Sequence, residues 1–165
     1  MKVNFGIYIG TSSASIAKME EGKVRVYRSD TQKDSIPIAV CFTKKGILTG
    51  EKAFNAWKIE ELKGRNTNCF IGFTRTLGSD IKFSSSNANR SFSSEELLAE
   101  VIKSLRSFVE DENVEAAVIT VPAAFEMNQI NEEAPFRQKE NLIIDYFNQT
   151  STNKFSEFQS QSKRE

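Results

Sequence analysis

Near its start the chain reads Val3-Asn4-Phe5-Gly6-Ile7-Tyr8-Ile9-Gly10-Thr11-Ser12-Ser13. Apolar side chains alternate through residues 3–9, which is the period-two pattern of a half-buried strand. A glycine and three hydroxyl residues follow at positions 10–13, and backbone amides approach a phosphate closely where glycine removes the Cβ obstacle. The stretch predicts a strand that leads into a phosphate-binding turn, although the same four residues also fit an ordinary hairpin turn.

The glycines are unevenly distributed along the chain, and none follows Gly78. A nucleotide clamped between two lobes needs backbone amides from both sides, so such a site requires a second glycine-bearing loop later in the sequence. The residues after Gly78 offer no such loop. The sequence therefore predicts half of a nucleotide site.

The charge and residue composition exclude several classes of function. The formal charge is zero, because 22 Lys and Arg residues balance 22 Asp and Glu residues. This balance argues against a nucleic acid or a membrane surface as the partner. The chain has no histidine, which excludes Ser-His-Asp and Cys-His catalysis and histidine-ligated metal sites. There is also no apolar run of about 18 residues, so no membrane span is predicted, and the N-terminal residues lack the apolar core of a secretory signal.

The cellular compartment is inferred from the two cysteines of the chain, Cys41 and Cys69. They are too few and too far apart in sequence to predict a disulfide scaffold or a zinc site. This usage is typical of a reducing compartment, so we expect a cytoplasmic protein.

Short strands dominate the first fifty residues. Residues 3–9, 13–19 and the region of Val24 and Val26 predict three strands of an antiparallel meander. Residues 36–42 predict a further extended segment, in which Pro37 lacks an N–H and belongs at an edge or at the strand start. A turn at residues 44–46 precedes a last short strand at 47–49.

Two helices are predicted. The first covers residues 51–62, with a buried stripe made by Ala53, Phe54, Trp57 and Leu62. After a Ser- and Asn-rich stretch at residues 63–92, which predicts irregular structure, a second helix begins with Ser93 as N-cap and Glu96 completing a capping box. Its apolar stripe consists of Leu97, Leu98, Val101, Ile102, Leu105, Phe108 and Val109.

The last predicted element of the domain is a buried central strand at residues 116–121, which is apolar on both faces and ends at Pro122. We expect residues 1–130 to form one partial domain and residues 131–165 to form a divergent tail. Within that tail residues 142–147 allow a short helix, and the polar residues from Asn148 onward predict disorder.

Four landmarks occur in a fixed order: Gly6 to Ser13; Ile36-Pro37 running to Gly50-Glu51-Lys52-Ala53; Phe73-Thr74-Arg75-Thr76-Leu77-Gly78; and Val118 to Ala123. Together they resemble the start of the ATPase domain of the heat-shock protein 70 family, within the actin-like ATPase superfamily. The resemblance covers roughly residues 3–130 and implies an α/β fold: one lobe of an actin-like (ribonuclease H-like) domain, a mixed sheet with flanking helices. It also implies a truncated, degenerate version of that domain.

The resemblance implies ATP and Mg²⁺ as cofactors and phosphoryl transfer to water as the family's reaction. Gly10, Thr11, Ser12 and Ser13 fall on the first phosphate loop. Tyr8 falls where the family has an aspartate that holds magnesium through water, and Thr74 falls at the catalytic lysine if Arg75 aligns with the following arginine. A second register places residues 68–72 on this segment and also lacks the lysine. Both departures remove charges that the chemistry needs, so we expect hydrolysis to be absent.

Three functional hypotheses follow. The chain is a chaperone-type nucleotide-binding lobe that does not hydrolyse ATP and binds it weakly or not at all. Alternatively, it is a non-catalytic interaction module that pairs through its exposed lobe interface, with itself, a chaperone relative or unfolded protein clients. In the third hypothesis it is half of an ATPase and works with a separately encoded second half.

Overall fold

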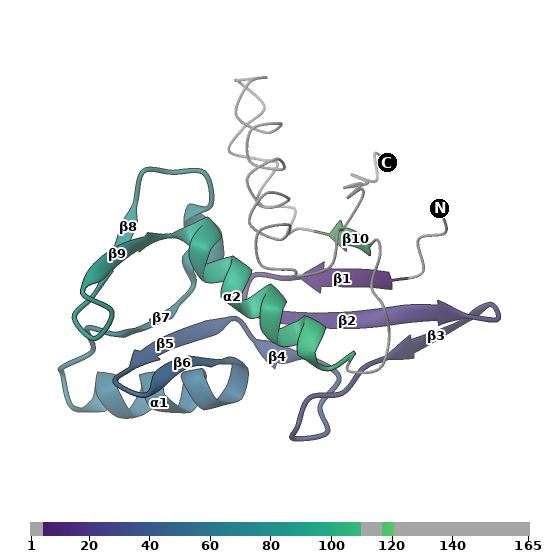
Figure 1. Cartoon of the computed structure of the whole chain (residues 1–165), viewed down its shortest axis with the longest axis horizontal. Helices are drawn as coiled ribbons and strands as arrows, with labels where there is room; N and C mark the ends of the chain where they lie inside the picture. The colour runs from purple at the N-terminus through teal and green to yellow at the C-terminus, as the bar shows by residue number, and fades with distance from the viewer. Residues whose placement is uncertain (1–4, 110–116, 121–165) are drawn as a thin grey trace.

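The computed structural model describes residues 5–109 and 117–120, which fold as a mixed α/β arrangement (Figure 1). This confirms the predicted fold class. The bounds of the elements, in chain order, are β1 Phe5–Ile9, β2 Ser13–Glu20, β3 Lys23–Val26, β4 Ile36–Pro37, β5 Ala39–Thr43, β6 Gly46–Thr49, α1 Gly50–Leu62, β7 Cys69–Ile71, the 3₁₀ turn η1 Phe73–Thr76, β8 Lys82–Ser85, β9 Arg90–Ser93, α2 Ser94–Ser107 and β10 Ala117–Thr120. The expectations about residues 121–165, including the tail, lie outside the described residues.

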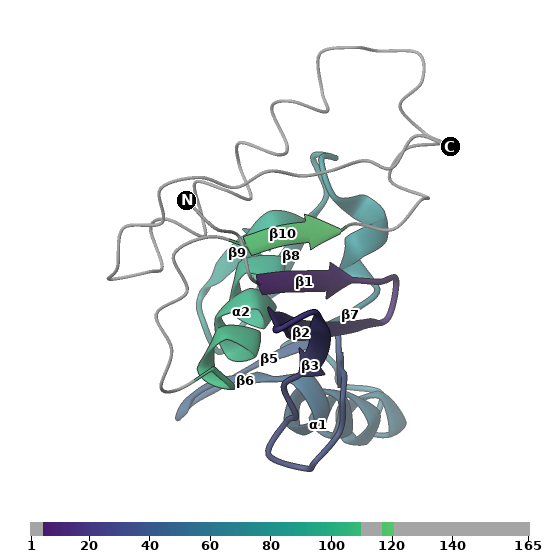
Figure 2. The same cartoon turned by 90° about the vertical axis from the view of Figure 1, so that its right-hand side faces the viewer.

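The main sheet has the strand order β10-β1-β2-β3, with β4 paired to β2 (Figure 2). The β1–β2 and β2–β3 pairs are antiparallel, which confirms the predicted meander. β10 runs parallel to β1, with Ile119 opposite Ile7. A parallel pair needs a long connection, and the chain between β1 and β10 contains α2, which packs on the main sheet.

The prediction that the strand around residues 116–121 is central and buried on both faces is wrong for the part described. β10 stands at one end of the strand order. Ala117 and Ile119 are buried, whereas Thr120 is exposed. Side chains alternate between the two faces of a strand, so only one face of β10 is packed into the core.

α2 lies along the sheet and closes the main core (Figure 1). Its predicted stripe is confirmed, because Leu97, Leu98, Val101, Ile102, Leu105 and Val109 are buried and Phe108 packs against the same core. The stripe meets the inward-facing positions of the sheet: Phe5, Ile7, Ile9, Ala14 and Ile16. Apolar side chains repeat at helical spacing on α2 and at every second residue on the strands, so the two surfaces form a single apolar layer between them.

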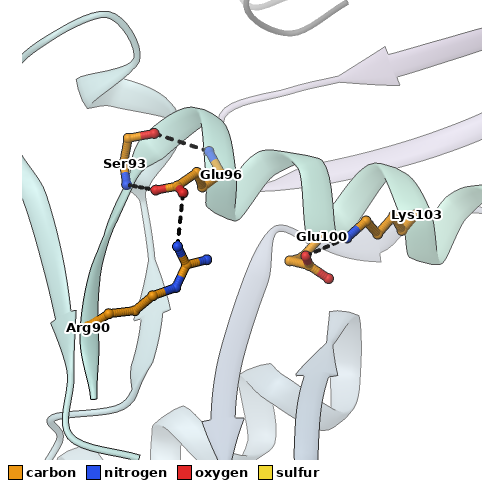
Figure 3. Close-up of polar contacts among 5 residues, drawn as sticks. All are labelled: Arg90, Ser93, Glu96, Glu100 and Lys103. Carbon is orange, nitrogen blue, oxygen red and sulfur yellow. Dashed lines mark hydrogen bonds and ion pairs between the residues drawn. The ribbon is translucent and has the colours of Figure 1, made fainter. Parts of the chain in front are cut away.

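The predicted capping box at the start of α2 is confirmed (Figure 3). The Ser93 hydroxyl accepts from the Glu96 backbone N–H at 3.2 Å, and the Ser93 N–H donates to the Glu96 carboxylate at 2.8 Å. Arg90 donates to the same carboxylate at 3.3 Å. Two N–H groups at the helix start are thereby satisfied within the chain.

The prediction of irregular structure at residues 63–92 is wrong, because β7, η1, β8 and β9 all form there. The hairpin β8–β9 pairs Phe83 with Phe92, and Phe92 stacks on Phe42 of β5 with ring centroids 4.2 Å apart. The Asn68 carboxamide oxygen accepts from Ser85, Ser86 and the Asn87 N–H. Aromatic pairing and side-chain amide bonds therefore order a segment whose composition is typical of a loop.

α1 packs on a second, smaller sheet of order β6-β5-β7. Ala53 is buried, and Phe54 and Trp57 are partly buried and stacked at 5.6 Å, as predicted. Leu62, placed in the buried stripe by its spacing, is 89% exposed, so that assignment is wrong. Thirteen helical residues span about 20 Å, while the small sheet offers strands of three to five residues. The last turn therefore runs past the surface it would pack on.

The two cysteines, which did not predict a disulfide scaffold, form a single disulfide bond that the sequence analysis did not anticipate. Cys41 in β5 and Cys69 in β7 are direct partners in the antiparallel ladder, with Cα atoms 4.0 Å apart. Their sequence separation of 28 conceals this register.

Among the described residues, neither helix is long and apolar enough to cross a bilayer.

Replacing the N-cap of α2 tests the capping box. We expect Ser93→Ala to lower the free energy of unfolding by about 1 kcal/mol, because it removes one of the two reciprocal bonds. The matched control is Glu100→Gln, which breaks only the exposed Glu100–Lys103 ion pair on the same helix (Figure 3) and costs at most about 0.5 kcal/mol. Urea denaturation of both variants measures the difference, and equal losses would contradict the assignment.

Candidate functional site

The hairpin turn between β1 and β2, residues 10–13, is the candidate phosphate-binding turn. The Gly10 N–H donates to the Ser13 carbonyl at 2.8 Å. A Cβ at Gly10 would lie 2.9 Å from the Tyr8 hydroxyl oxygen and 3.0 Å from the Ser13 carbonyl oxygen. The small residue is therefore required by the packing of the hairpin on itself, and its amide already has a partner.

Tyr8 lies on the outer face of β1, where it is 54% exposed. Its ring edge covers Gly10, as the close approach of its Cε1 and hydroxyl atoms to a Cβ at that position shows. The phenol fills the space beside the turn.

Thr74 connects the segment assigned to the family's lysine with the turn at residues 10–13. It lies in η1, is buried, and its hydroxyl donates to the Thr11 carbonyl oxygen at 3.0 Å. Asn68, which begins the segment of the second register, is bonded instead to Ser85 and Asn87. The structure thus brings residue 74, the position assigned to the family's lysine, into contact with the turn.

The turn is also tied to the start of the small sheet. The Ser12 carbonyl accepts from the Ile38 N–H at 2.8 Å, and Ser13 pairs with Pro37 in the β2–β4 ladder. The side chains of Thr11 and Ser12 remain exposed. Three polar backbone groups of the turn, the Gly10 N–H and the Thr11 and Ser12 carbonyls, therefore have partners within the protein. The turn is a structural junction between β1, η1 and the segment of β4 and Ile38.

The segment around η1 is anchored to the N-terminus of α2, which the sequence did not indicate. The Thr76 and Ser94 hydroxyls lie 2.8 Å apart, and the Gly78 N–H donates to the carboxylate of Glu95. Glu95 is buried, and this bond supplies the partner that a buried carboxylate needs. The adjacent acids Glu95 and Glu96 thus have different tasks: one holds the η1 segment and the other caps the helix.

A second polar region was not predicted from the sequence. A cavity of about 240 Å³ lies between the 29–31 loop, β6 and the facing ends of α1 and α2. At its edge, a hydrogen bond from Lys33 and a second one from Thr31 hold the pKa of the Glu51 carboxyl below its ordinary value. These contacts stabilise the fold above the ordinary carboxyl pKa, and the contribution is lost as the pH falls through the lowered value. The cavity is built from four separate segments, so no local pattern could have revealed it.

The described residues offer no obvious metal centre. Within residues 5–109 and 117–120, no group of three or more Cys, Asp or Glu side chains is placed to hold a metal ion. Tyr8 contributes a phenol, which is neutral at pH 7 and a poor substitute for a hard carboxylate ligand. The geometry around the turn therefore does not fit magnesium.

Residues 4–132 match the family model described as Hsp70 protein. Similar curated proteins include the chaperone protein DnaK of Elusimicrobium minutum (strain Pei191), 36% identical over 132 residues that cover 75% of this chain and 20% of that protein. Heat shock 70 kDa protein 6, chloroplastic, of Arabidopsis thaliana is 28% identical over 146 residues, with 75% and 20% covered. The chaperone protein dnaK of Cyanidium caldarium is 29% identical over 145 residues, with 75% and 24% covered. The chain spans about a fifth to a quarter of the length of these relatives.

Two threonines of η1 form a matched pair for testing the junction. Thr74→Val and Thr76→Val are both nearly isosteric, and each removes one hydroxyl, so we expect each to cost about 1 kcal/mol of stability. Only the Thr74 hydroxyl reaches the turn, whereas that of Thr76 bonds to Phe73 and Ser94. Amide hydrogen exchange at Gly10 should rise in Thr74→Val and stay unchanged in Thr76→Val. The same exchange rate in both variants would show that Thr74 does not hold the turn.

Proposed function

Because this chain belongs to the Hsp70 family and its described part is a lobe of the actin-like ATPase fold, we propose that it is a nucleotide-binding-domain lobe that does not hydrolyse ATP. The family binds ATP with Mg²⁺ and acts as chaperones. The proposal concerns what this chain retains of that activity. It rests on one observation above others, the buried hydrogen bond from Thr74 to Thr11.

At residue 74 the family pattern requires a lysine beside the phosphates. Threonine is neutral, and here its hydroxyl is buried and already donates to the turn. Losing a preorganised positive group next to a transferring phosphoryl commonly costs several kcal/mol of transition-state stabilisation. The hydrogen bond between Thr74 and Thr11 therefore supports the proposal that residue 74 has a structural role and not a catalytic one.

The turn itself supports the same conclusion. An anion held by backbone N–H groups needs donors that have no other partner. The Gly10 N–H is already used by Ser13, and the Tyr8 ring covers the glycine from the outer side. The Gly10 N–H is therefore not available to a phosphate, and the neutral phenol of Tyr8 is a poor partner for magnesium.

A second candidate function is an interaction module, and the outer face of the main sheet favours it. The strand registers place Tyr8, Met19, Val24 and Val26 on the face opposite α2, and all four are exposed. Exposed apolar surface of this kind marks interaction sites more often than ordinary protein surface does. With a formal charge of zero, two copies of the chain have no net repulsion. We take a second copy as the occupant of this face; chaperone relatives and unfolded polypeptides are the other partner classes that the family suggests.

The ATPase proposal is tested by melting the full chain with and without millimolar Mg-ATP. We expect no change of the midpoint and no phosphate release above the buffer rate. The assay is sensitive, because ligand at about 1,000 times its Kd adds about 4 kcal/mol to stability. A DnaK chaperone measured in parallel is the positive control. A midpoint rise of several degrees, or steady turnover, would contradict the proposal.

The interaction module is tested by sedimentation over a range of concentrations. We expect dimerisation that Val24→Asp weakens strongly, because a desolvated carboxylate is costly in an apolar interface. Lys23→Asp is the matched control: it adds the same residue to β3 on the other face, and should leave dimerisation unchanged. A wild-type chain that stays monomeric and binds no hydrophobic dye would rule out this role.

A further inference from the structure

We propose that the Cys41–Cys69 disulfide is a redox-responsive clamp that holds α1 on its small sheet, and that its reduction loosens this part of the chain while the main sheet stays folded. The part concerned, called the α1 unit below, consists of β6 and α1, which lie between the two cysteines in sequence. The inference is independent of whether the chain binds ATP.

The apolar core beneath α1 is small. Its fully buried members are Ala39, Cys41, Ala53 and Cys69. Two of these four are the cysteines themselves, so the disulfide is a large part of what the helix packs on. The remaining contacts come from partly buried side chains such as Phe54 and Trp57.

The N-terminal end of α1 contributes little to its stability, whereas its C-terminal end is closed by Gly64 at a φ of 63°, with the Gly64 and Arg65 N–H groups donating to the Glu61 and Glu60 carbonyls. Its N-cap, Thr49, makes no side-chain capping bond, and its last turn has no basic residue. The last turn also carries the exposed Leu62. α2, by contrast, has a complete capping box. Because a helix of this length is marginal on its own, α1 depends on the surface below it.

The disulfide lies at one end of the β5–β7 ladder. The β5–β7 ladder has three residue pairs, and Cys41–Cys69 is the terminal one, at the start of β7. Asn66 brackets Cys69, accepting from its N–H at 3.0 Å and donating to its carbonyl at 2.8 Å. The covalent loop from residue 41 to 69 encloses β6 and all of α1. Closing such a loop restricts the unfolded states available to this segment.

The loosening should stop at Gly72. Beyond it, Phe73 and Leu77 belong to the main core, and Thr74 and Thr76 bond to Thr11 and Ser94. On the other side of the clamp, Val40 and Phe42 of β5 also belong to the main core. The main sheet, η1 and α2 therefore keep their own anchors when the clamp opens.

The chemistry is thiol–disulfide exchange with a small-molecule dithiol. One thiolate of the dithiol attacks a sulfur of the pair, breaks the S–S bond and forms a mixed disulfide. Its second thiol then displaces the remaining cysteine, so the dithiol becomes a cyclic disulfide and supplies two electrons and two protons to Cys41 and Cys69. Both cysteines are buried, so α1 must lift before the attack, and the reaction reports on the opening of this unit.

The test uses the full chain, purified under alkylating conditions and compared with and without dithiothreitol. A non-reducing peptide map should show the 41–69 linkage. Hydrogen exchange should rise in residues 46–62 on reduction and stay unchanged in β1, β2 and α2, and the melting midpoint should fall by roughly 10 °C. Absence of the linkage, or exchange that rises equally throughout the chain, would overturn the proposal.

The control is the double variant Cys41→Ala/Cys69→Ala. It should show the exchange pattern of the reduced wild type and no response to dithiothreitol. Should the variant not fold, the comparison of oxidised and reduced wild type decides alone, because both forms carry the same sequence. A dithiothreitol response retained in the folded variant would also overturn the proposal.

Discussion

The burial of the apolar stripe of α2 against the inner face of β1 and β2 is the interaction on which the rest of the structure depends. It fixes the N-terminus of α2, and through Ser94 and Glu95 that terminus holds the η1 segment. η1 in turn places the Thr74 hydroxyl against the β1–β2 turn. The candidate site is thus positioned by a chain of contacts that begins in the core, and none of them requires a nucleotide.

This order of contacts shows that the architecture of the lobe does not depend on the chemistry of a nucleotide site. The positions that build the lobe are apolar or capping positions, and they are satisfied by burial and by hydrogen bonds within the chain. The positions that serve a triphosphate are charges, and charges beside a site add nothing to folding when the ligand is absent. In the proposed function, Tyr8 and Thr74 are substitutions of the second kind. Each replaces a charge by a group that packs or bonds locally.

Features that depend on residues close together in the sequence could be predicted, whereas features that depend on residues far apart could not. The meander, the capping box of Ser93 and Glu96 and the stripe of α2 depend on local periodicity, and all are present. The hairpin at residues 82–93 lies where composition predicted irregular structure, and the pairing of Cys41 with Cys69, 28 residues apart, was not predicted because it depends on the strand register. Leu62 fits its helical stripe, but the sheet beneath it ends too soon. For the site, the turn at residues 10–13 was predicted from its glycine and hydroxyl residues, and the role of position 74 came from the resemblance; the bond that joins them could only be seen in the fold.

The two cores of the lobe are unequal, and this matters for how a lack of nucleotide binding is interpreted. The turn at residues 10–13 rests on the larger core, which contains Ile9, Ala14 and Phe73. The small core under α1 buries fewer apolar residues, so it is the part expected to open first. In sequence its residues precede Gly72, whereas Thr74 follows it. Local unfolding in a protein begins where few apolar contacts are buried. If the folded chain does not bind ATP, the cause is therefore the missing charges of the site. An unfolded turn is not the cause, because the scaffold that carries the turn is the most firmly packed part of the structure.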